Sequence, residues 1–494
     1  MGAERFSGCR TTVLALSVGM CFALASSLDG QAGVGPGGAS SVPKARCGPG
    51  SRTESGLQGQ TTAAERFSAG ASKQAYNCNL DLVGQAQEQG ANWDMVIFDA
   101  CVYVATANGA QQQRRGTMVV DASDSRRLKV TAYLDSNVMS QPNETLAVHA
   151  GRKLLAGARL NGEEFEVYDL SVDCRHPVLK GSLKLSGIAA HAGVFAPDGR
   201  TYYGTSYTNV PPTVYAVDVS DPSKPREIAR WTPPKNVGVT HHLSISEDGT
   251  KAYVGLIGND PKRPGSNGFT TVDISDVQSR RPNVEFRVLG RLVWDDGAGG
   301  QVPLPLTING RPHVIFTDVT GPGGPGRNVS AAACAQGMPP HGFARIIDIS
   351  DVQNPKIVAR LMLEVHNPAN CAKVLNDPLN ESGYAGYSST FCAADNPRAA
   401  KLLACAYYEG GLRLFDIRDP FRPREIAYYK PPARGKDLLP GSGLAGMNAE
   451  RTADAVILPH FRLDRGEIWF ISQDNGFQIV RFTDWLKTTE KDLF

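Results

Sequence analysis

The chain lacks almost all of the apolar periodicity that marks amphipathic helices, with residues 483–493 as the exception. Beyond its N-terminus it also lacks any stretch long and apolar enough to cross a bilayer. Neither charge sign dominates, because 51 Lys and Arg stand against 49 Asp and Glu. That balance gives neither a nucleic-acid footprint nor a polybasic membrane signal. We therefore expect no nucleic-acid partner and no membrane span in the mature chain.

Familiar catalytic and metal motifs are also missing. No CxxC pair occurs, which argues against a zinc ribbon or a thioredoxin-like site. The GxSxG and HExxH motifs, Walker-type loops and a GxGxxG followed by a helix are absent as well. Sequence motifs therefore specify no reaction, and the question of whether the protein is an enzyme stays open at this stage.

Repeated strands and turns are what the sequence does contain. Residues 214–230 run from an apolar stretch rich in β-branched residues through Asp-x-Ser-Asp and Pro to a second short strand, which predicts a β-hairpin. The same pattern recurs at intervals of 48 to 75 residues. Its first Asp position is occupied in turn by Asp121, Asp169, Asp218, Asp273, Asp348, Asp416 and, in the last copy, Arg481. Repeats of this length made of strands and turns indicate a β-propeller with one four-stranded blade per repeat.

Seven copies of the pattern predict an all-β fold, a seven-bladed β-propeller. Residues 78–84 resemble the second half of the repeat without a first half before them, and the seventh copy lies close to Phe494. We therefore expect this N-terminal strand to complete the last blade and close the ring. Asp198-Gly199 and Asp248-Gly249 predict tight hairpins between the inner and second strands of blades three and four.

The first residues have the composition of a secretory signal. Arg5 and Arg10 precede a short apolar stretch, residues 12–25, and small residues follow it. We expect residues 1–27 to be a signal peptide, residues 28–75 a flexible low-complexity leader, and residues 76–494 the propeller. On this interpretation the mature protein is secreted or otherwise extracytoplasmic, in a periplasm or at a cell surface.

If the chain is exported, the eight cysteines that follow the signal are candidates for disulfide bonds. An even number of cysteines in an oxidising compartment suggests up to four disulfides. Cys392 and Cys405 are expected on neighbouring strands of one blade, either bridged or as two buried thiols. Sequons at Asn143, Asn328 and Asn380 matter only in a host that glycosylates exported chains.

Loop lengths distinguish the two faces of the predicted disc. Connections from inner to second strands and from third to outer strands are short, and we call their face the short-turn face. The opposite, long-loop face carries insertions at residues 258–268, 321–342 and 366–386. Long loops on a rigid scaffold are where binding and catalysis usually occur. We expect the long-loop face to be functional and the short-turn face to be structural, with its Asp side chains capping turn amides.

Several histidines fall on the long-loop face. His191 and His241 each lie seven residues before the Asp of an Asp-Gly turn, which places them at the start of two inner strands, beside the central channel. His460 precedes the corresponding turn of blade seven, and His366 belongs to a long insertion. Imidazoles that converge on the channel mouth could bind copper or zinc. The alternative is that they are satisfied polar residues lining a wet channel, and the sequence leaves both interpretations open.

The repeat is similar to the LVIVD-repeat family of exported β-propellers, most clearly over residues 214–230, 345–360 and 412–427. This resemblance spans about residues 90–485 and implies a seven-bladed propeller outside the cytoplasm, without a defined reaction. His191 and His241 with their Asp-Gly turns also resemble the selenium-binding-protein and methanethiol-oxidase propellers, although the surrounding motifs differ. Those propellers place histidines at inner strands and use copper, so this second resemblance implies a copper site.

Two functions follow as hypotheses. The first is a binding scaffold that takes an unknown protein or small-molecule ligand on the long-loop face, and we expect it to be a monomer. The second is a copper-dependent oxidoreductase with a histidine site at the channel mouth, which needs at least three converging ligands and an open coordination position. Convergence of the imidazoles would favour the enzyme, whereas scattered imidazoles would favour the scaffold.

Overall fold

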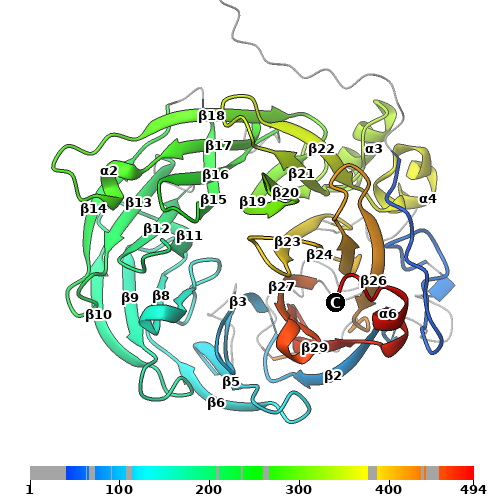
Figure 1. Cartoon of the computed structure of the whole chain (residues 1–494), viewed down its shortest axis with the longest axis horizontal. Coiled ribbons are helices and arrows are strands. Elements are labelled where there is room, and N and C mark those ends of the chain that lie inside the picture. The colour runs from blue at the N-terminus through cyan, green and yellow to red at the C-terminus, as the bar shows by residue number, and fades with distance from the viewer. Residues whose placement is uncertain are drawn as a thin grey trace, which may run out of the picture. The chain divides into compact units, whose positions relative to one another are not determined.

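The structure is a computed structural model in which seven antiparallel sheets form the blades of a β-propeller around a central axis (Figure 1). It confirms the predicted all-β, seven-bladed fold. The structure describes residues 40–62, 64–65, 73–90, 92–106, 114–206, 211–234, 237–259, 266–375, 386–434, 439–440 and 456–494. The expected signal peptide, residues 1–27, and the sequon at Asn380 lie outside these ranges. Within the ranges, no helix has the length and apolar character of a membrane span.

Blades one to four each contain four strands in chain order from the axis outward. Blade one consists of β3 (Asn92–Phe98), β4 (Cys101–Thr106), β5 (Thr117–Asp121) and β6 (Lys129–Leu134). Blade two consists of β7 (Ala147–His149), β8 (Leu154–Ala158), β9 (Glu164–Asp169) and β10 (Val178–Lys184). Blade three consists of β11 (Ala190–Phe195), β12 (Thr201–Ser206), β13 (Thr213–Asp218) and β14 (Arg226–Trp231). Blade four consists of β15 (Val239–Ile245), β16 (Lys251–Ile257), β17 (Asn267–Asp273) and β18 (Arg287–Trp294).

Blades five to seven carry the helical insertions and the chain ends. Blade five consists of β19 (Ala298–Ile308), β20 (Arg311–Thr320), β21 (Ala344–Asp348) and β22 (Lys356–Leu361). Blade six contains β23 (Ser389–Ala394), β24 (Leu402–Tyr407), β25 (Gly411–Asp416) and β26 (Arg424–Lys430), and blade seven contains β27 (Val456–Arg462), β28 (Glu467–Ser472) and β29 (Gly476–Phe482). In the described ranges the helices are α2 (Ser275–Gln278), α3 (Arg327–Ala335), α4 (Cys371–Leu375) and α6 (Asp484–Thr489), with short 3-10 turns η3 (Ala150–Arg152), η4 (Glu364–His366), η5 (Pro368–Asn370) and η7 (Leu463–Arg465).

Apolar clusters between neighbouring blades form the core. Each of the seven blade-to-blade interfaces has its own cluster of buried side chains, so no single central core exists among the described residues. Between blades two and three, for example, Phe165, Tyr202 and Tyr215 pack as neighbouring rings. A four-stranded sheet presents two faces, and it can bury both of them only against the next blade on each side.

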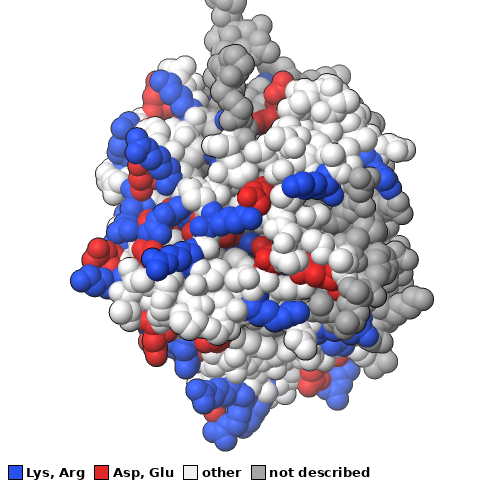
Figure 2. All heavy atoms as spheres, turned by 90° about the vertical axis from the view of Figure 1, so that its right-hand side faces the viewer, with Lys and Arg blue, Asp and Glu red and all other residues white. Residues whose placement is uncertain are grey.

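The repeated Asp residues cap turns, as the sequence predicted. The Asp218 carboxylate accepts a hydrogen bond from the backbone N–H of Ser220, two residues later, at 3.1 Å. The same bond recurs in five of the six other blades, at Asp121, Asp169, Asp273, Asp348 and Asp416. Exposed cations pair with several of these carboxylates, such as Arg226 with Asp218 at 2.7 Å. On the side of the molecule drawn in Figure 2, basic and acidic side chains lie intermixed.

The two N-terminal strands pair with the last two blades in chain order, blades six and seven. Strand β1 (Tyr76–Cys78) pairs antiparallel with β26 and is a fifth strand of blade six. Strand β2 (Leu80–Ala86) pairs antiparallel with β29, so it lies at the outer edge of blade seven. Asn79, between the two strands, has a left-handed backbone (φ 63°), which allows the sharp change of direction. Residues early in the chain thus form main-chain ladders with two late blades.

Residues 40–62 belong to the segment that composition predicted to be a flexible leader, but the structure packs them against blade six. Glu54 pairs with Arg413 of β25 and, at 3.3 Å, with Lys430 of β26, and all three side chains are buried. Arg413 also pairs with Glu425 at 3.0 Å, and Gln58 donates a hydrogen bond to the same carboxylate at 2.9 Å. Polar partners thus hold a segment that has few apolar residues to bury. The boundaries at residues 27 and 75 stay predictions.

Four disulfides confirm the pairing potential of the eight cysteines. Cys392 and Cys405 are bridged across the neighbouring strands β23 and β24, which decides between the two expected alternatives. The other bridges join the N-terminal segment to β1 (Cys47–Cys78), blade one to blade two (Cys101–Cys174) and helix α3 to helix α4 (Cys334–Cys371). Four disulfides are consistent with an extracytoplasmic protein.

We predict that Glu54→Gln destabilises the protein by about 3 kcal/mol, because it leaves the buried Lys430 charge without its ion-pair partner and Arg413 with Glu425 alone. Burial alone would raise the pKa of Glu54, but the charges of Arg413 and Lys430 outweigh burial and lower it. The contribution of Glu54 is therefore complete above the ordinary carboxyl pKa of 4.5 and is lost as the pH falls through the lower folded-state pKa. Denaturant unfolding at neutral and acidic pH measures both effects.

Asp124→Asn is the control, because Asp124 forms an exposed pair with Arg127 on blade one. Exposed pairs contribute little, so this variant should unfold at nearly the wild-type denaturant concentration at both pH values. Equal stability of Glu54→Gln and the wild type at neutral pH would show that the buried network does not stabilise the fold.

Candidate metal centre

Bulges at the starts of the inner strands decide which side chains face the propeller axis. In β11 the register with β12 shifts between Ala190 and Ala192, and His191 lies in that bulge. In β15 the shift between Thr240 and Leu243 includes His241. A bulge adds an unpaired residue and turns its side chain away from the regular alternation. The two histidines that the sequence placed at equivalent positions therefore also share a local backbone irregularity.

The same irregularity recurs in the other inner strands that begin at the axis. Register shifts in β3, β19, β23 and β27 contain Trp93, Gln301, Phe391 and Ile457, respectively. Blade two is different, because its inner strand β7 is short and the preceding loop occupies the corresponding place. Glu144 of that loop forms an isolated parallel bridge with Ala192. Its carbonyl also accepts a hydrogen bond from the backbone N–H of Gly193 at 3.1 Å.

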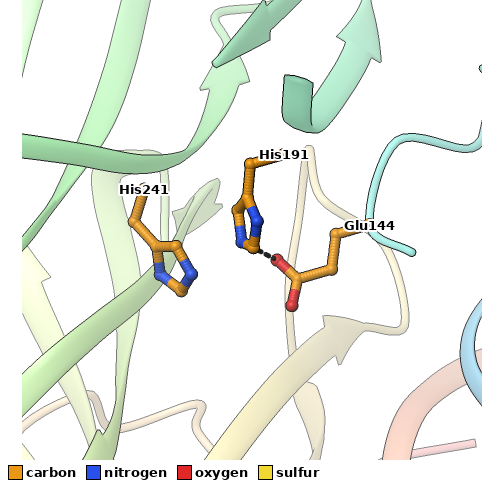
Figure 3. Close-up of side chains that lie close together, drawn as sticks. All are labelled: Glu144, His191 and His241. Atoms are coloured by element: carbon orange, nitrogen blue, oxygen red, sulfur yellow. Dashed lines mark ion pairs between the residues drawn. The ribbon is translucent and has the colours of Figure 1, made fainter. Parts of the chain in front are cut away.

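Glu144, His191 and His241 come together at this position (Figure 3). One ligand atom from each residue lies within 4.8 Å of the others. His191 Nε2 is 3.4 Å from Glu144 Oε2, and the two imidazoles stack with ring centroids 4.7 Å apart. Only 3% of Glu144, 6% of His191 and 5% of His241 is exposed. The result is a buried cluster of one carboxylate and two imidazoles, contributed by three successive blades or their connecting loop.

Donors from blades one and five hold the Glu144 carboxylate in one orientation. The indole N–H of Trp93 in β3 donates to Glu144 Oε1 at 2.8 Å. The side-chain amide of Gln301 in β19 donates to the same oxygen at 2.9 Å. These two bonds occupy Oε1, so Oε2 is the oxygen that faces His191. Outer partners of this kind fix the orientation of metal-binding groups and influence their basicity.

The backbone of β19 fixes the orientation of His241. Its Nδ1 lies 2.7 Å from the carbonyl oxygen of Gly300, which can only accept a hydrogen bond. The proton of the neutral ring is therefore on Nδ1, and Nε2 carries the lone pair. Burial, followed by the neighbouring His191, lowers the pKa of His241 to about 3, so the ring is neutral at physiological pH. A neutral imidazole is the form that binds metals.

The pKa values of two carboxyl groups, Glu144 in the cluster and Asp94 near it, are shifted in opposite directions. Burial alone would raise the pKa of Glu144, but the charge and hydrogen bond of His191 outweigh burial and hold it well below its ordinary value. Burial and then the negative charge of Glu144 raise the pKa of Asp94 well above its ordinary value. Asp94 is thus protonated more readily than Glu144, which limits the repulsion between two buried carboxylates.

The donor set suits a divalent transition metal. Two imidazoles and one carboxylate hold zinc in several hydrolytic enzymes, and the same combination holds non-haem iron. Ligand atoms at about 2.1 Å from one ion lie at most about 4.2 Å apart, so a separation of 4.8 Å closes with small side-chain rotations. Three protein ligands leave at least one coordination position for water or a small ligand.

The structure does not bring His366 and His460 into this cluster. The insertion that contains His366 folds into η4, where His366 Nδ1 accepts from Leu363 N–H at 2.9 Å and Nε2 contacts the Tyr387 carbonyl oxygen at 3.0 Å. Both ring nitrogens of His366 therefore contact backbone groups, those of Leu363 and Tyr387. His460 lies in β27, opposite Trp469, and its Nε2 contacts the Met95 carbonyl oxygen at 3.1 Å. Its shorter spacing from the turn places it outside the bulge of β27, unlike the bulge positions of His191 and His241.

Glu144 is the residue that sequence reasoning missed. In the sequence it stood out only as the middle residue of the sequon at Asn143. Asn143 is itself 5% exposed and has a left-handed backbone (φ 50°), so its amide is built into the fold. Glu144 lies in a connecting loop that the repeat pattern does not include. No periodic signal therefore marked it.

Known proteins give a fold but no family. No protein-family model matches the chain, and no curated protein matches it in sequence. Among solved structures, a chain of Kuenenia stuttgartiensis hydrazine synthase is similar with a TM-score of 0.51 and 15% identity, over 80% of this chain and 96% of that chain. At this identity the likeness concerns the fold alone. The LVIVD-repeat and copper-propeller resemblances stay predictions, and what the comparisons show for this chain is a β-propeller fold.

Proposed function

We propose that this β-propeller is a metal-binding scaffold that holds one divalent transition-metal ion between Glu144, His191 and His241. The observation that carries the proposal is the convergence of these three buried donors within 4.8 Å of one another. Zinc is the expected ion, because a carboxylate with two imidazoles is a common zinc donor set. The open coordination position is the point at which a ligand of the protein binds.

The long-loop face is the proposed route to this site. Glu144 lies in the connection between blades one and two, which belongs to that face, and His191 and His241 lie where their strands begin on it. The disulfide between Cys334 and Cys371 joins α3 and α4, so it links two of the long insertions on the same face. A long-loop face braced by a disulfide suits the recognition of a ligand outside the cytoplasm.

A copper-dependent oxidoreductase is the second candidate. The convergence of His191 and His241 supports it, because converging imidazoles were expected of the enzyme, but only these two of the four predicted histidines meet and imidazoles suit zinc as well. Redox chemistry at this site requires a metal that changes its oxidation state, which zinc does not do. The identity of the bound metal therefore separates the two candidates.

We predict about one zinc ion per chain in protein that is purified without chelators and analysed for zinc, copper and iron. Glu144→Gln and His241→Ala should each weaken zinc binding at least about 100-fold, because loss of a ligand costs more than the 10- to 100-fold loss typical of an outer partner. Titration calorimetry with zinc chloride on metal-stripped protein measures the affinity. One copper per chain instead of zinc would favour the oxidoreductase.

His176→Gln is the control for this experiment, because His176 is exposed on blade two and pairs with Asp173 at 3.0 Å. It should bind zinc as the wild type does. Circular dichroism and thermal unfolding show whether each variant is folded. A wild-type protein that binds neither zinc nor copper nor iron(II), even after incubation with each, contradicts the proposed function.

We further predict that Trp93→Phe weakens zinc binding about tenfold, because Glu144 Oε1 then keeps only the Gln301 donor. The matched control is Trp231→Phe, since Trp231 stacks on Phe286 in the outer part of blade three. Titration calorimetry compares the two variants. Equal zinc affinities would show that the Trp93 indole does not orient the carboxylate.

A further inference from the structure

A second candidate site lies on the short-turn face, between blades one and two. Four loops surround a cavity of about 340 Å³ there, a volume typical of small-ligand pockets. The loops are the β3–β4 and β5–β6 connections of blade one and the β7–β8 and β9–β10 connections of blade two. Phe98, Leu170 and the Cys101–Cys174 disulfide contribute apolar surface. This face was expected to be purely structural.

The β9–β10 loop of blade two departs from the repeat at this cavity. The first Asp and the Pro of the pattern are seven residues apart in blade three (Asp218, Pro225) and likewise in blades five and six. In blade two, Asp169 and Pro177 are eight residues apart, and the corresponding spacing in blade four, from Asp273 to Pro282, is nine. The longer loop places Val172 at the cavity, where 90% of it is exposed. Val172 is therefore an apolar side chain that is available for contact at the rim of the cavity.

Two charged residues at the cavity occupy strained backbone positions. Blades three, four and seven place glycine in the left-handed region at the turn between inner and second strands: Gly199 (φ 64°), Gly249 (φ 71°) and Gly466 (φ 65°). Blades one and two place Asp99 (φ 51°) and Lys153 (φ 53°) there instead. A lysine in this region is uncommon, and such strain is concentrated at functional sites. Both residues line the cavity.

Among the charged side chains that line the cavity, Asp99 and Lys153 are available to pair with a ligand. Asp173 pairs with Arg175 at 2.8 Å and contacts His176 at 3.0 Å, and Asp121 lies 3.9 Å from the same guanidinium, so each of these charges already has a neighbour of its own. In the described part of the chain, neither the Asp99 carboxylate nor the Lys153 ammonium has an ion-pair partner. The cavity therefore offers one free anion, one free cation and an apolar surface.

We propose that this cavity binds a free α-amino acid with an aliphatic side chain. Lys153 pairs with the α-carboxylate of the ligand, and Asp99 pairs with its α-ammonium group. Val172, which is 90% exposed at the rim, contacts the aliphatic side chain, with the edge of Phe98 behind it. A zwitterion with an apolar side chain matches both free charges and the apolar surface at once, whereas an anion or a cation alone would leave one charge unused.

L-leucine is the probe, titrated into the full-length mature protein and followed by calorimetry. We expect saturable binding with one site per chain at millimolar concentrations. L-leucinol, which lacks the carboxylate, and 4-methylpentanoate, which lacks the ammonium group, should each bind at least about tenfold more weakly. Absence of saturable L-leucine binding to the wild type overturns the proposal, as does equal binding of all three compounds.

Two variants test the residues. Lys153→Gly removes the cation and the backbone strain together, so it should weaken L-leucine binding at least about tenfold while the thermal unfolding midpoint stays the same or rises. Asp99→Asn should weaken binding similarly, since Asn tolerates the left-handed region and keeps the turn. Lys224→Gln, in the β13–β14 loop of blade three, is the control and should bind L-leucine normally. Unchanged binding in both cavity variants, with folding intact, overturns the proposal.

Discussion

Apolar packing between neighbouring blades is the interaction on which the rest of this structure depends. Every blade buries its two faces against the blades beside it, and each interface has its own cluster of side chains. Between blades seven and one, the cluster extends to Phe391 and Tyr408 of blade six. Because the blades position one another, the starts of their inner strands are held at fixed places around the axis. The candidate metal centre is built at those places.

The polar cluster of Glu144, His191 and His241 depends on these fixed positions, because several blades together stabilise its buried carboxylate. Burying a carboxylate costs free energy unless hydrogen bonds and opposite charges replace its water. Glu144 has donors from blade one and blade five, and His191 from blade three faces its other oxygen. Blades that lie apart around the ring thus stabilise one buried charge together. The arrangement also presents the carboxylate in a single orientation, which a metal site needs and a purely structural ion pair does not.

The two faces of the propeller are less different than their loop lengths suggest. The long-loop face contains the insertions and the disulfide between α3 and α4, yet the cavity between blades one and two opens among short turns. Two charged residues in place of turn glycines distinguish that region, and its β9–β10 loop is one residue longer than those of blades three, five and six. Small local departures from a repeat are therefore as informative as long insertions, because the repeat itself defines what a purely structural turn requires.

The sequence by itself determined the number of blades, the turn role of the repeated Asp residues and the shared position of His191 and His241. Each of these rests on short-range physics: Asp218, for example, caps an amide only two residues away. Tertiary structure alone decided that Glu144 joins the two histidines and that His366 and His460 do not. Glu144 meets His191 because blades two and three pack together, and Trp93 and Gln301 reach Glu144 across sequence separations of 51 and 157 residues. Contacts of that range depend on how whole blades pack, which no local pattern in the chain records.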